Sequence, residues 1–550
     1  MSYKNKKINN LVKIKDNDKK NLNIKDKVFF KNINNKKLVM FLFCFLLAFI
    51  LLLLCSKCSF LYPFNGWDDF NSFYTMASGW ANGLIPYRDL FEQKGPFLYI
   101  IFMIGYFISP GKFSGIFILE VIFLGIILYI SSKIVEMFID EKKYPKGKYL
   151  ILLLYGVLMT TSISFVEGGS SEEFNLLFTT ITIYYIVKYL KNGELVDISY
   201  KHLIICGLCC GLSLMIKYTT VGLWFIMMAY ICIKLFTLKR YKEAIFKGII
   251  FIVIMLIPFG IFSIYFYMND ALIDFLDVYF YINIFKYSYE SNFILNLLMG
   301  FYNIFLVFFS NFTVVGIFYL IFWYYLGKKI KGNYKVNLSK KQLLFIGIIL
   351  FNILILYYGQ VFRMYAIGAA FYVMLFIIIH FYELYGKHRL FKYGCGIYVI
   401  IALFLSIDFK YITASNSDIV QFRFADIINE VEDASILQYR AIDGGFYTAS
   451  GILPSKRYFA QVNIGFDKLS ESYNEQDSVI INKEVDFIIV RVFDLDKKDT
   501  IFNVNEIGKI KHNERINLDF IGLYYDLVDV YENEYGYYDG CIFYLYKAKK

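Results

Sequence analysis

The chain has 550 residues, of which 58% are hydrophobic and 20% are aromatic, and its mean hydropathy is +0.50. These values lie well outside the range of soluble globular domains and indicate an integral membrane protein. The formal net charge of +11 does not indicate nucleic-acid binding, because the basic residues lie in short clusters between apolar runs.

The N-terminal segment, residues 1–37, is rich in lysine, with twelve lysines before residue 38. We expect a cytoplasmic tail held near anionic lipid headgroups, since clustered lysines are attracted to the inner leaflet. The apolar run 38–61 follows. It is long enough to span a bilayer and no small-residue cleavage site follows it, so we expect a membrane span and not a cleaved signal peptide.

Eleven apolar runs in the sequence reach the approximate length of a membrane span. They lie near 38–61, 113–138, 148–166, 174–190, 202–217, 219–236, 247–267, 311–327, 343–359, 366–383 and 394–409. With the lysine tail inside, eleven spans place the C-terminus outside. The loops then predicted to be inside carry most of the basic residues, at 142–146, 191–201, 239–247, 328–341 and 387–392. This agreement with the positive-inside rule predicts the orientation.

Two further apolar stretches, Pro96–Pro110 and Phe293–Ser310, would each invert the sorting of charge if they crossed the membrane. We expect both to lie in the outer leaflet as helices. If instead both cross, the number of spans becomes thirteen and both termini keep their sides.

The composition changes near residue 409, where aspartate, glutamate and asparagine become common. Ala425–Val431 has the spacing of a helix. Four segments have the character of strands, at 435–439, 485–491, 523–531 and 541–547. We therefore expect a polytopic α-helical core over residues 38–408, followed by a small extracytoplasmic α/β domain over residues 409–550.

The loop 62–112, which follows the first predicted span, carries Asp68 and Asp69 at the lipid–water boundary. Carboxylates at this depth are poorly solvated and costly, so we interpret the pair as functional. Histidine offers no alternative chemistry here. Three of the four histidines fall at predicted cytoplasmic ends of spans and the fourth lies in the C-terminal domain, so we expect neither a His-based triad nor a multi-His metal site.

The external loop 167–173 has a similar design. A glycine turn is followed by Glu172 and Glu173 at the start of a predicted helix, where the helix dipole favours negative charge. The functional interpretation is a second acidic loop at the site. The alternative is a capping role, with Ser170 or Ser171 as the N-cap and the glutamates completing it.

Cations on the predicted outer side are scarce, which makes each of them informative. Arg88 and Lys94 lie in the first loop, Lys217 ends the run 202–217, and Arg363 lies in a late external loop. A cluster of cations at this interface would suit a lipid-linked phosphate, which needs charge neutralisation where lipid meets water. Taken singly, each could also be an anchor that extends its charge towards the headgroups.

The stretch 67–102, WDDFNSFYTMASGWANGLIPYRDLFEQKGPFLYIIF, resembles the first external loop of the GT-C glycosyltransferases, the superfamily of protein O-mannosyltransferases and lipid A aminoarabinose transferases. Members pair an acid just after the first span with an amphipathic helix, a G-x-x-PY-x-D turn and a K-G/P-P-L-x-Y segment. These elements correspond here to Asp69, Asn71–Ala81, Gly83–Asp89 and Lys94–Tyr99. The stretch 442–464 is similar to the external domain of bacterial members.

The resemblance implies a membrane glycosyltransferase of the hexosyltransferase class, acting at the outer face of the plasma membrane. The donor would be a polyprenyl-phosphate sugar, and the acceptor a glycan, lipid or protein. Asp69, with Asp68 beside it, would be the general base of an inverting transfer. Lys94, Lys217, Arg363 or Arg88 would bind the donor phosphate.

The resemblance leaves the metal open. Some relatives place a divalent cation such as Mg²⁺ or Mn²⁺ near the acids, and others need none. Many relatives also carry a histidine–tyrosine pair in the last external loop, where this chain has Arg363, Met364 and Tyr365.

Two other functions are alternatives to the enzyme. A transporter or flippase of a lipid-linked sugar would need charges within the spans or broken helices in repeated halves. A non-catalytic membrane scaffold would leave the acidic first loop without a role. Retained function after removal of every acid in the first loop would favour either of these over the enzyme.

Overall fold

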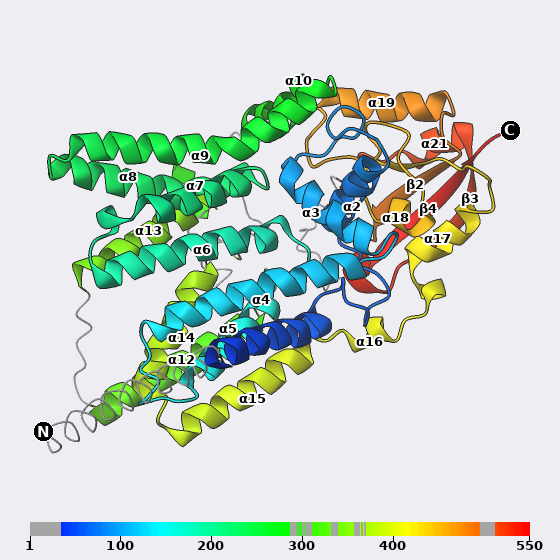
Figure 1. Ribbon diagram of the computed structural model, residues 1–550. Coiled ribbons are helices and arrows are strands. Elements are labelled where there is room, and N and C mark those ends of the chain that lie inside the picture. Colours follow the sequence, from blue (N-terminus) through cyan, green and yellow to red (C-terminus); the bar gives the residue numbers. More distant parts are fainter. Residues whose placement is uncertain are drawn as a thin grey trace, which may run out of the picture.

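The computed structural model describes residues 35–286, 311–331, 339–356, 370–494 and 512–550, with isolated positions at 294–295, 298–299, 302, 364 and 367. Most long helices run roughly side by side through one end of the molecule (Figure 1). A four-stranded sheet and its helices form the other end, and the helices α2 and α3 of the first loop lie between the two parts.

Helices occupy all eleven ranges in which apolar runs predicted spans. They are the first helix Asn35–Cys55, α4 Ser114–Glu136, α5 Gly147–Thr160, α6 Ser171–Asn192, α7 Tyr200–Leu214, α8 Gly222–Thr237, α9 Tyr241–Met268, α12 Asn311–Lys331, α13 Lys340–Leu356, α14 Ala370–Tyr385 and α15 Arg389–Ser406. Among the described residues, five helical segments are long and apolar enough to cross a membrane: Asn35–Cys55, Ser114–Glu136, Tyr218–Thr237, Tyr241–Met268 and Arg389–Ser406. The helical membrane class is confirmed, while the number of spans stays a prediction.

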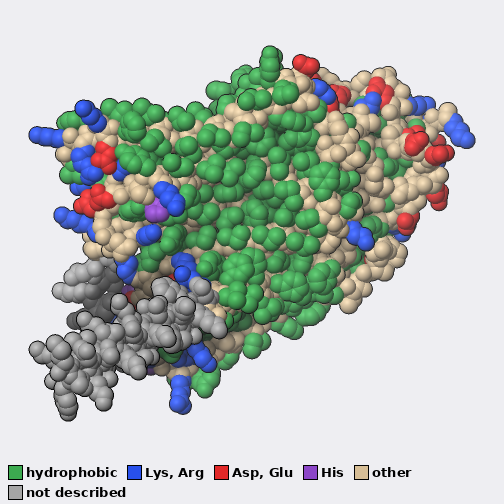
Figure 2. All heavy atoms as spheres, in the orientation of Figure 1, with side chains coloured by type: hydrophobic (Ala, Val, Ile, Leu, Met, Phe, Trp, Pro, Cys, Tyr) green, Lys and Arg blue, Asp and Glu red, His purple; other side chains and the backbone are tan. Residues whose placement is uncertain are grey.

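Apolar side chains form a broad band around the helical part (Figure 2). Charged side chains gather at the two ends of this band, with lysine and arginine prominent at the end furthest from the sheet. Helix α9 contributes to the band with exposed Ile252, Val253, Ile261 and Ile264. Exposed aliphatic side chains of this kind suit lipid as a solvent and support a membrane location.

Close packing of α7 against α9 depends on small residues in the α7 sequence, since small side chains let helix backbones approach closely. Gly211 lies directly on α9, where an added Cβ would be 2.3 Å from the carbonyl oxygen of Met255. Gly207 lies one turn earlier against Phe251 and Ile254. The two helices therefore approach each other backbone to backbone.

The first helix ends at Cys55, six residues before the end of the predicted run 38–61. The polar groups of the next two residues form hydrogen bonds with distant parts of the chain. Ser56 Oγ donates to Glu120 Oε2 in α4 at 2.8 Å, and the Lys57 N–H donates to the Glu167 carbonyl at 2.8 Å. These bonds turn the chain out of the helix and connect the first loop to the second acidic loop.

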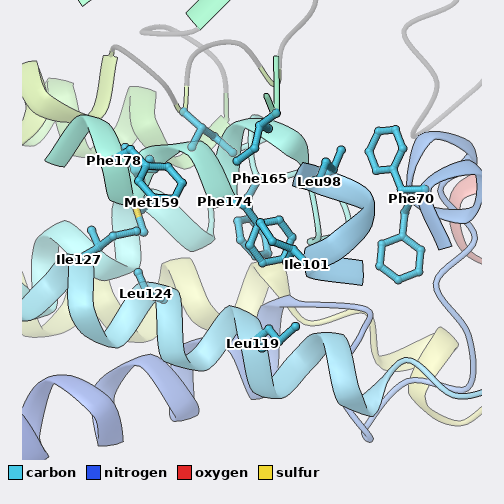
Figure 3. Packing of buried hydrophobic residues seen from close by; sticks show 14 of the residues in the cluster. Phe70, Leu98, Ile101, Leu119, Leu124, Ile127, Met159, Phe165, Phe174 and Phe178 are labelled. Carbon is cyan, nitrogen blue, oxygen red and sulfur yellow. The ribbon is translucent and has the colours of Figure 1, made fainter. Parts of the chain in front are cut away.

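The first loop contains α2, Asp68–Ala81, and α3, Pro96–Ile108, which correspond to the two helices predicted there. Pro96 begins α3 at a position where the missing N–H costs nothing. Both helices bury one face in the main core, which continues into α4, α5 and α6 (Figure 3). Phe70 of α2 packs against Phe102 of α3, with 5.3 Å between the ring centroids, and Phe102 packs against Phe174 of α6 at 5.9 Å. The other predicted interfacial stretch, Phe293–Ser310, lies almost entirely outside the described residues.

Short helical elements lie between or after the long helices α6, α7, α8 and α9. They are η1 Leu195–Asp197, η2 Tyr218–Val221, α10 Leu272–Leu276 and the π-helix η3 Asp277–Lys286. The chain after α15 begins with α16 Phe409–Ile412, η5 Asn416–Asp418 and α17 Val420–Ile428, which overlaps the predicted helix Ala425–Val431.

All four predicted strands are present, as β1 Ile436–Tyr439, β2 Phe487–Phe493, β3 Tyr525–Glu532 and β4 Cys541–Ala548. They form one sheet in the order β1-β2-β4-β3, with β1 and β2 parallel and the other pairs antiparallel. The remaining elements are α18 Phe446–Ser450, α19 Ser470–Ile481, α21 Leu518–Tyr524 and η6 Gly536–Tyr538. The division at residue 409 into a separate domain stays a prediction.

The two faces of this sheet pack against different layers. Along β2, Phe487, Ile489 and Phe493 point to one face and join the main core that continues into the helices. Ile488 and Val490 point to the other face and form a second core with α19 and α21. By the same alternation, position 491 lies on the face with the main core. This position is occupied by arginine, although the other residues of β2 on that face are apolar.

Candidate active site

The two acids predicted to be functional lie in the first turn of α2, where the helix dipole favours negative charge. Because successive residues on a helix point about 100° apart, the two carboxylates face different surroundings. Asp68 faces the C-terminal sheet and Asp69 faces the start of α3 and the loops between the helices, as their charged neighbours show.

Asp68 is buried and forms an ion pair with Arg491 of β2, with 3.5 Å between Oδ2 and Nη1. Burial raises the pKa of Asp68 to about 6, Arg491 opposes this rise, and Asp69 adds to it. The Asp68 carboxylate is thus occupied by a contact with the C-terminal part of the chain.

Asp69 is partly exposed, and among the described residues no hydrogen-bond donor or cation lies within bonding distance of its carboxylate. Four charged side chains surround it at longer range: Lys94, Glu92, Glu172 and Lys217. Burial raises the pKa of Asp69, Lys94 and Lys217 oppose the rise, and the two glutamates add to it. A carboxylate with unused acceptor capacity and a raised pKa is suited to accept a proton.

Lys94 is held at the start of α3 by Glu92. The Lys94 ammonium lies 3.7 Å from Glu92 Oε1 and 5.2 Å above the ring of Phe73. Glu92 Oε2 accepts hydrogen bonds from the Lys94 N–H, at 2.8 Å, and from the hydroxyl of Tyr99. The side chain of Lys94 keeps 20% of its surface exposed, and its charge is one of the four that act on Asp69.

Lys217 reaches the cluster from the segment between α7 and η2. Its ammonium lies 2.5 Å from Glu172 Oε1, and Ser171 Oγ donates to Glu172 Oε2 at 2.8 Å. Burial raises the pKa of Glu172, but Lys217 outweighs burial and the net shift is downward, so the carboxylate is ionised at neutral pH. The pair is nearly enclosed, with exposed side-chain fractions of 10% for Lys217 and 2% for Glu172.

Backbone hydrogen bonds fix the two lysines relative to each other. The Gly95 N–H donates to the Ile216 carbonyl at 2.9 Å, and the Phe97 N–H donates to the Met215 carbonyl at 3.0 Å. Gly95 is required for this approach, because an added Cβ would lie 2.0 Å from the Met215 oxygen. The K-G-P sequence therefore places Lys94 next to Lys217 through the backbone.

Gly95→Ala is expected to destabilise the protein by about 1–3 kcal/mol, because the methyl group must displace a backbone carbonyl that cannot rotate away. It should also lower activity, since Lys94 and Lys217 would no longer be held together. Thermal unfolding in detergent measures the first effect. Gly260→Ala in α9 is the matched control, because an added Cβ there meets nothing within 4 Å. Equal stability of the two variants would contradict the role of Gly95.

In a comparison with solved structures, the chain aligns with ArnT from Cupriavidus metallidurans. For ArnT bound to undecaprenyl phosphate, the TM-score is 0.50 with 8% identity, over 92% of this chain and 97% of that chain. For apo ArnT the TM-score is 0.51 with 8% identity, over 94% and 98%. ArnT is a GT-C superfamily member.

The chain has the GT-C fold.

The resemblance of the first loop to GT-C proteins is thus confirmed at the level of the fold, and at 8% identity the likeness carries no conclusion about activity. The oligosaccharyltransferase AglB from Archaeoglobus fulgidus, in complex with an inhibitory peptide and a dolichol-phosphate, aligns with a TM-score of 0.45 and 10% identity, over 92% of this chain and 74% of that chain. At that TM-score it adds nothing to the assignment. No protein-family model and no curated protein sequence matches the chain.

Within this GT-C fold, the second acidic loop combines both interpretations offered by its sequence. Glu172 faces the lysines, as the functional interpretation requires. Glu173 has the capping role, because its N–H donates to Ser170 Oγ at 3.0 Å and its carboxylate accepts from the Gly169 N–H at 2.9 Å. The same Gly169 N–H donates to Glu120 of α4 at 2.8 Å, which ties the loop to the helix.

Two of the cations predicted to bind phosphate are not part of the described cluster. Arg88 donates to Asp89 at 2.7 Å and to the Asn269 carbonyl at 2.7 Å, and its side chain is 41% exposed. Its charged neighbours are Asp89, Asp270 and Asp274, so it belongs to the outer rim and not to the group around Asp69. Arg363 lies outside the described residues.

Arg491 was not singled out by the sequence. One signal was present in the sequence of β2. Every second residue of the strand lies on its inner face, and these residues are apolar except for the arginine at position 491. A charge on the buried face of a strand needs a partner, because isolated buried charges are strongly unfavourable. The sequence does not contain the identity of that partner.

Three carboxylates gather in this part of the GT-C fold, but among the described residues they are not arranged to hold a divalent cation. Glu92 is engaged by Lys94 and Tyr99, and Glu172 by Lys217 and Ser171, which leaves Asp69 as the carboxylate with free acceptors. In the part of the chain that the structure describes, no group of three or more His, Cys, Asp or Glu residues is arranged to hold a metal ion. The two lysine ammonium groups supply positive charge here.

Chelation is expected to leave activity unchanged, because lysines and not a divalent cation neutralise the carboxylates of this cluster. Transfer should be within about twofold of the untreated level in membranes washed with excess EDTA. Activity that is lost with EDTA and restored by Mg²⁺ or Mn²⁺ would contradict the expectation and assign Asp69 to a metal.

Proposed function

We propose that the protein is an integral membrane glycosyltransferase that transfers a sugar from a polyprenyl-phosphate donor to an acceptor hydroxyl. The observation that carries the proposal is the Asp69 carboxylate in a chain with the GT-C fold. It is free of hydrogen bonds among the described residues, and the charges of two held lysines, Lys94 and Lys217, act on it. ArnT, which shares the fold, has been crystallised with undecaprenyl phosphate.

In the proposed reaction, the acceptor hydroxyl attacks the anomeric carbon and Asp69 accepts its proton. The new C–O bond forms as the bond from the anomeric carbon to the phosphate oxygen breaks, so the configuration inverts and polyprenyl phosphate leaves. A positioned base contributes about 10²–10⁴-fold to the rate. No general acid is required, because a phosphate is a good leaving group.

Lys94 and Lys217 are proposed to bind the donor phosphate. Both ammonium groups are held in place before substrate arrives, Lys94 by Glu92 and Lys217 by Glu172. Preorganised cations stabilise the charge that develops on the leaving phosphate without reorganisation during the reaction. The polyprenyl chain would extend from this point along the apolar surface of the helices (Figure 2).

We place the reaction at the outer face of the plasma membrane, with the N-terminal tail inside and the C-terminal sheet outside. The support is the distribution of lysine and arginine between the predicted loops, together with their prominence at the end of the molecule furthest from the sheet. A hexose is the proposed sugar class, and a glycan, lipid or protein hydroxyl is the proposed acceptor.

Sugar transfer from radiolabelled polyprenyl-phosphate sugars, in membranes that contain the wild-type protein, tests the proposal. Label is expected to move into acceptor material with at least one sugar of a panel, and membranes without the protein serve as the control. If no sugar is transferred to any acceptor fraction while labelled lipid crosses the bilayer, the protein is a transporter and the proposal is wrong.

A further inference from the structure

Arg491 is the contact that links the C-terminal sheet to the acidic turn of α2. It lies on the inner face of β2, is 4% exposed, and approaches Asp68 at 3.5 Å. The guanidinium lies 4.6 Å from the centroid of the Tyr538 ring, a cation–π contact that adds to the ion pair. The two charged partners are 423 positions apart in the chain.

Further bonds from the C-terminal part of the chain hold α2 and the segment that precedes it. Thr75 of α2 donates to Asp443 at 2.6 Å, and the Tyr411 hydroxyl donates to the Phe64 carbonyl at 2.7 Å. Gly445 lies so close to α2 that an added Cβ would be 2.8 Å from Asn71 Oδ1. The segment 442–464 is thus a fixed support of the first loop, with its DGG turn on α2.

We propose that Arg491 is a positioning residue of the active centre, which holds the first turn of α2 through Asp68 and so fixes the direction of the Asp69 carboxylate. The active centre is then incomplete without the C-terminal sheet. This inference rests on the proposed function, because Asp69 is the base that Arg491 positions.

The chemistry of the pair favours this role over simple neutralisation of charge. Burial raises the pKa of Asp68 and Arg491 opposes the rise, so loss of the cation would raise this pKa further and favour the neutral acid. A neutral Asp68 would lose the ion pair that fixes the helix start relative to the sheet. Asp69 is the next residue in the same helical turn, so a small rotation of that turn would misdirect its carboxylate.

The test compares Arg491→Met, Arg491→Lys and Asp68→Asn with the double variant Asp68→Asn/Arg491→Met in steady-state transfer assays. Arg491→Met is expected to lower kcat about tenfold or more with KM for the donor within about twofold, because the donor phosphate is held by other cations. Arg491→Lys should regain most of the loss. Asp68→Asn and the double variant should be equally impaired, since either change releases the same contact.

Arg423→Met is the matched control. Arg423 also forms an ion pair with an aspartate, Asp529 of β3, but it is 43% exposed, and its guanidinium also contacts the ring of Tyr531. A kcat for Arg491→Met equal to that of Arg423→Met, or additive losses in the double variant, would overturn the proposal.

A second measurement separates this inference from the proposed function. Thermal unfolding of the same variants in detergent needs no substrate, and the shifts in Tm for Asp68→Asn and Arg491→Met should not add in the double variant. If the wild type transfers no sugar while this coupling is present, the proposed function fails and the link between sheet and turn stands. If coupling is absent, the link itself is wrong.

Discussion

Asp69→Asn is expected to lower sugar transfer by about 10²–10⁴-fold, the contribution of a positioned general base. The amide cannot accept the proton of the acceptor hydroxyl, yet it has the shape of the carboxylate. Folding should be little affected, because among the described residues the Asp69 carboxylate makes no hydrogen bond or ion pair that the change would remove. The loss should appear in kcat, since the lysines proposed to bind the donor are unchanged.

The pH dependence of transfer should carry the signature of this base. Only the ionised carboxylate can accept a proton, and the pKa of Asp69 is raised by burial and by Glu92 and Glu172 against Lys94 and Lys217. Activity in the wild type should therefore fall as pH decreases through a range above that of an ordinary aspartate. The rate of Asp69→Asn should lack this decline.

Asp270→Asn is the matched control for the base. Asp270 is exposed on the outer rim and has a positive φ of 53°, a conformation that asparagine tolerates. Transfer by this variant should equal that of the wild type. Undiminished transfer by Asp69→Asn at normal expression would show that another group is the base.

Lys217→Met is expected to have the largest combined effect on stability and activity. Glu172 would remain ionisable in a site where it is 2% exposed and without its cation, and breaking a buried ion pair from one side costs about 3–5 kcal/mol. Transfer should fall about 10²–10³-fold in addition, as for loss of one preorganised group that stabilises developing negative charge.

The double variant Glu172→Gln/Lys217→Met separates the two effects. Without the carboxylate, no buried charge lacks a partner, so most of the lost stability should return. Activity should not return, because the cation for the phosphate is still missing. Thermal unfolding and transfer, measured on the same preparations, distinguish a stabilising pair from a phosphate site. Recovery of both would show that Lys217 only neutralises Glu172.

Local pattern in the sequence was sufficient for the elements of this fold. Hydropathy located eleven helices, and alternation located the four strands, because both reflect the solvent or core that each residue meets within its own segment. The end of the first helix was missed. The predicted run extended to Leu61 because Cys58, Phe60 and Leu61 are apolar. The bonds of Ser56 and Lys57 to distant partners turn the chain after Cys55.

The candidate site was predicted as residue types and not as an arrangement. Asp69, Lys94, Lys217 and Glu172 come together as expected of an acidic loop with scarce cations. Arg88 is also a cation in the first loop, yet it pairs with Asp89 on the rim. The charge of a loop residue and its position along the chain do not determine which way its side chain faces.

The sequence by itself determined a helical membrane protein with an acidic first loop and a C-terminal sheet. Only the tertiary structure decided that Asp68 and Asp69 have different partners, and that Arg491 reaches the first turn of α2. The physical reason is that sequence patterns are local, whereas these contacts join distant parts of the chain. Hydropathy and alternation record the environment of a segment, whereas an ion pair between residues 423 positions apart depends on how the whole chain packs.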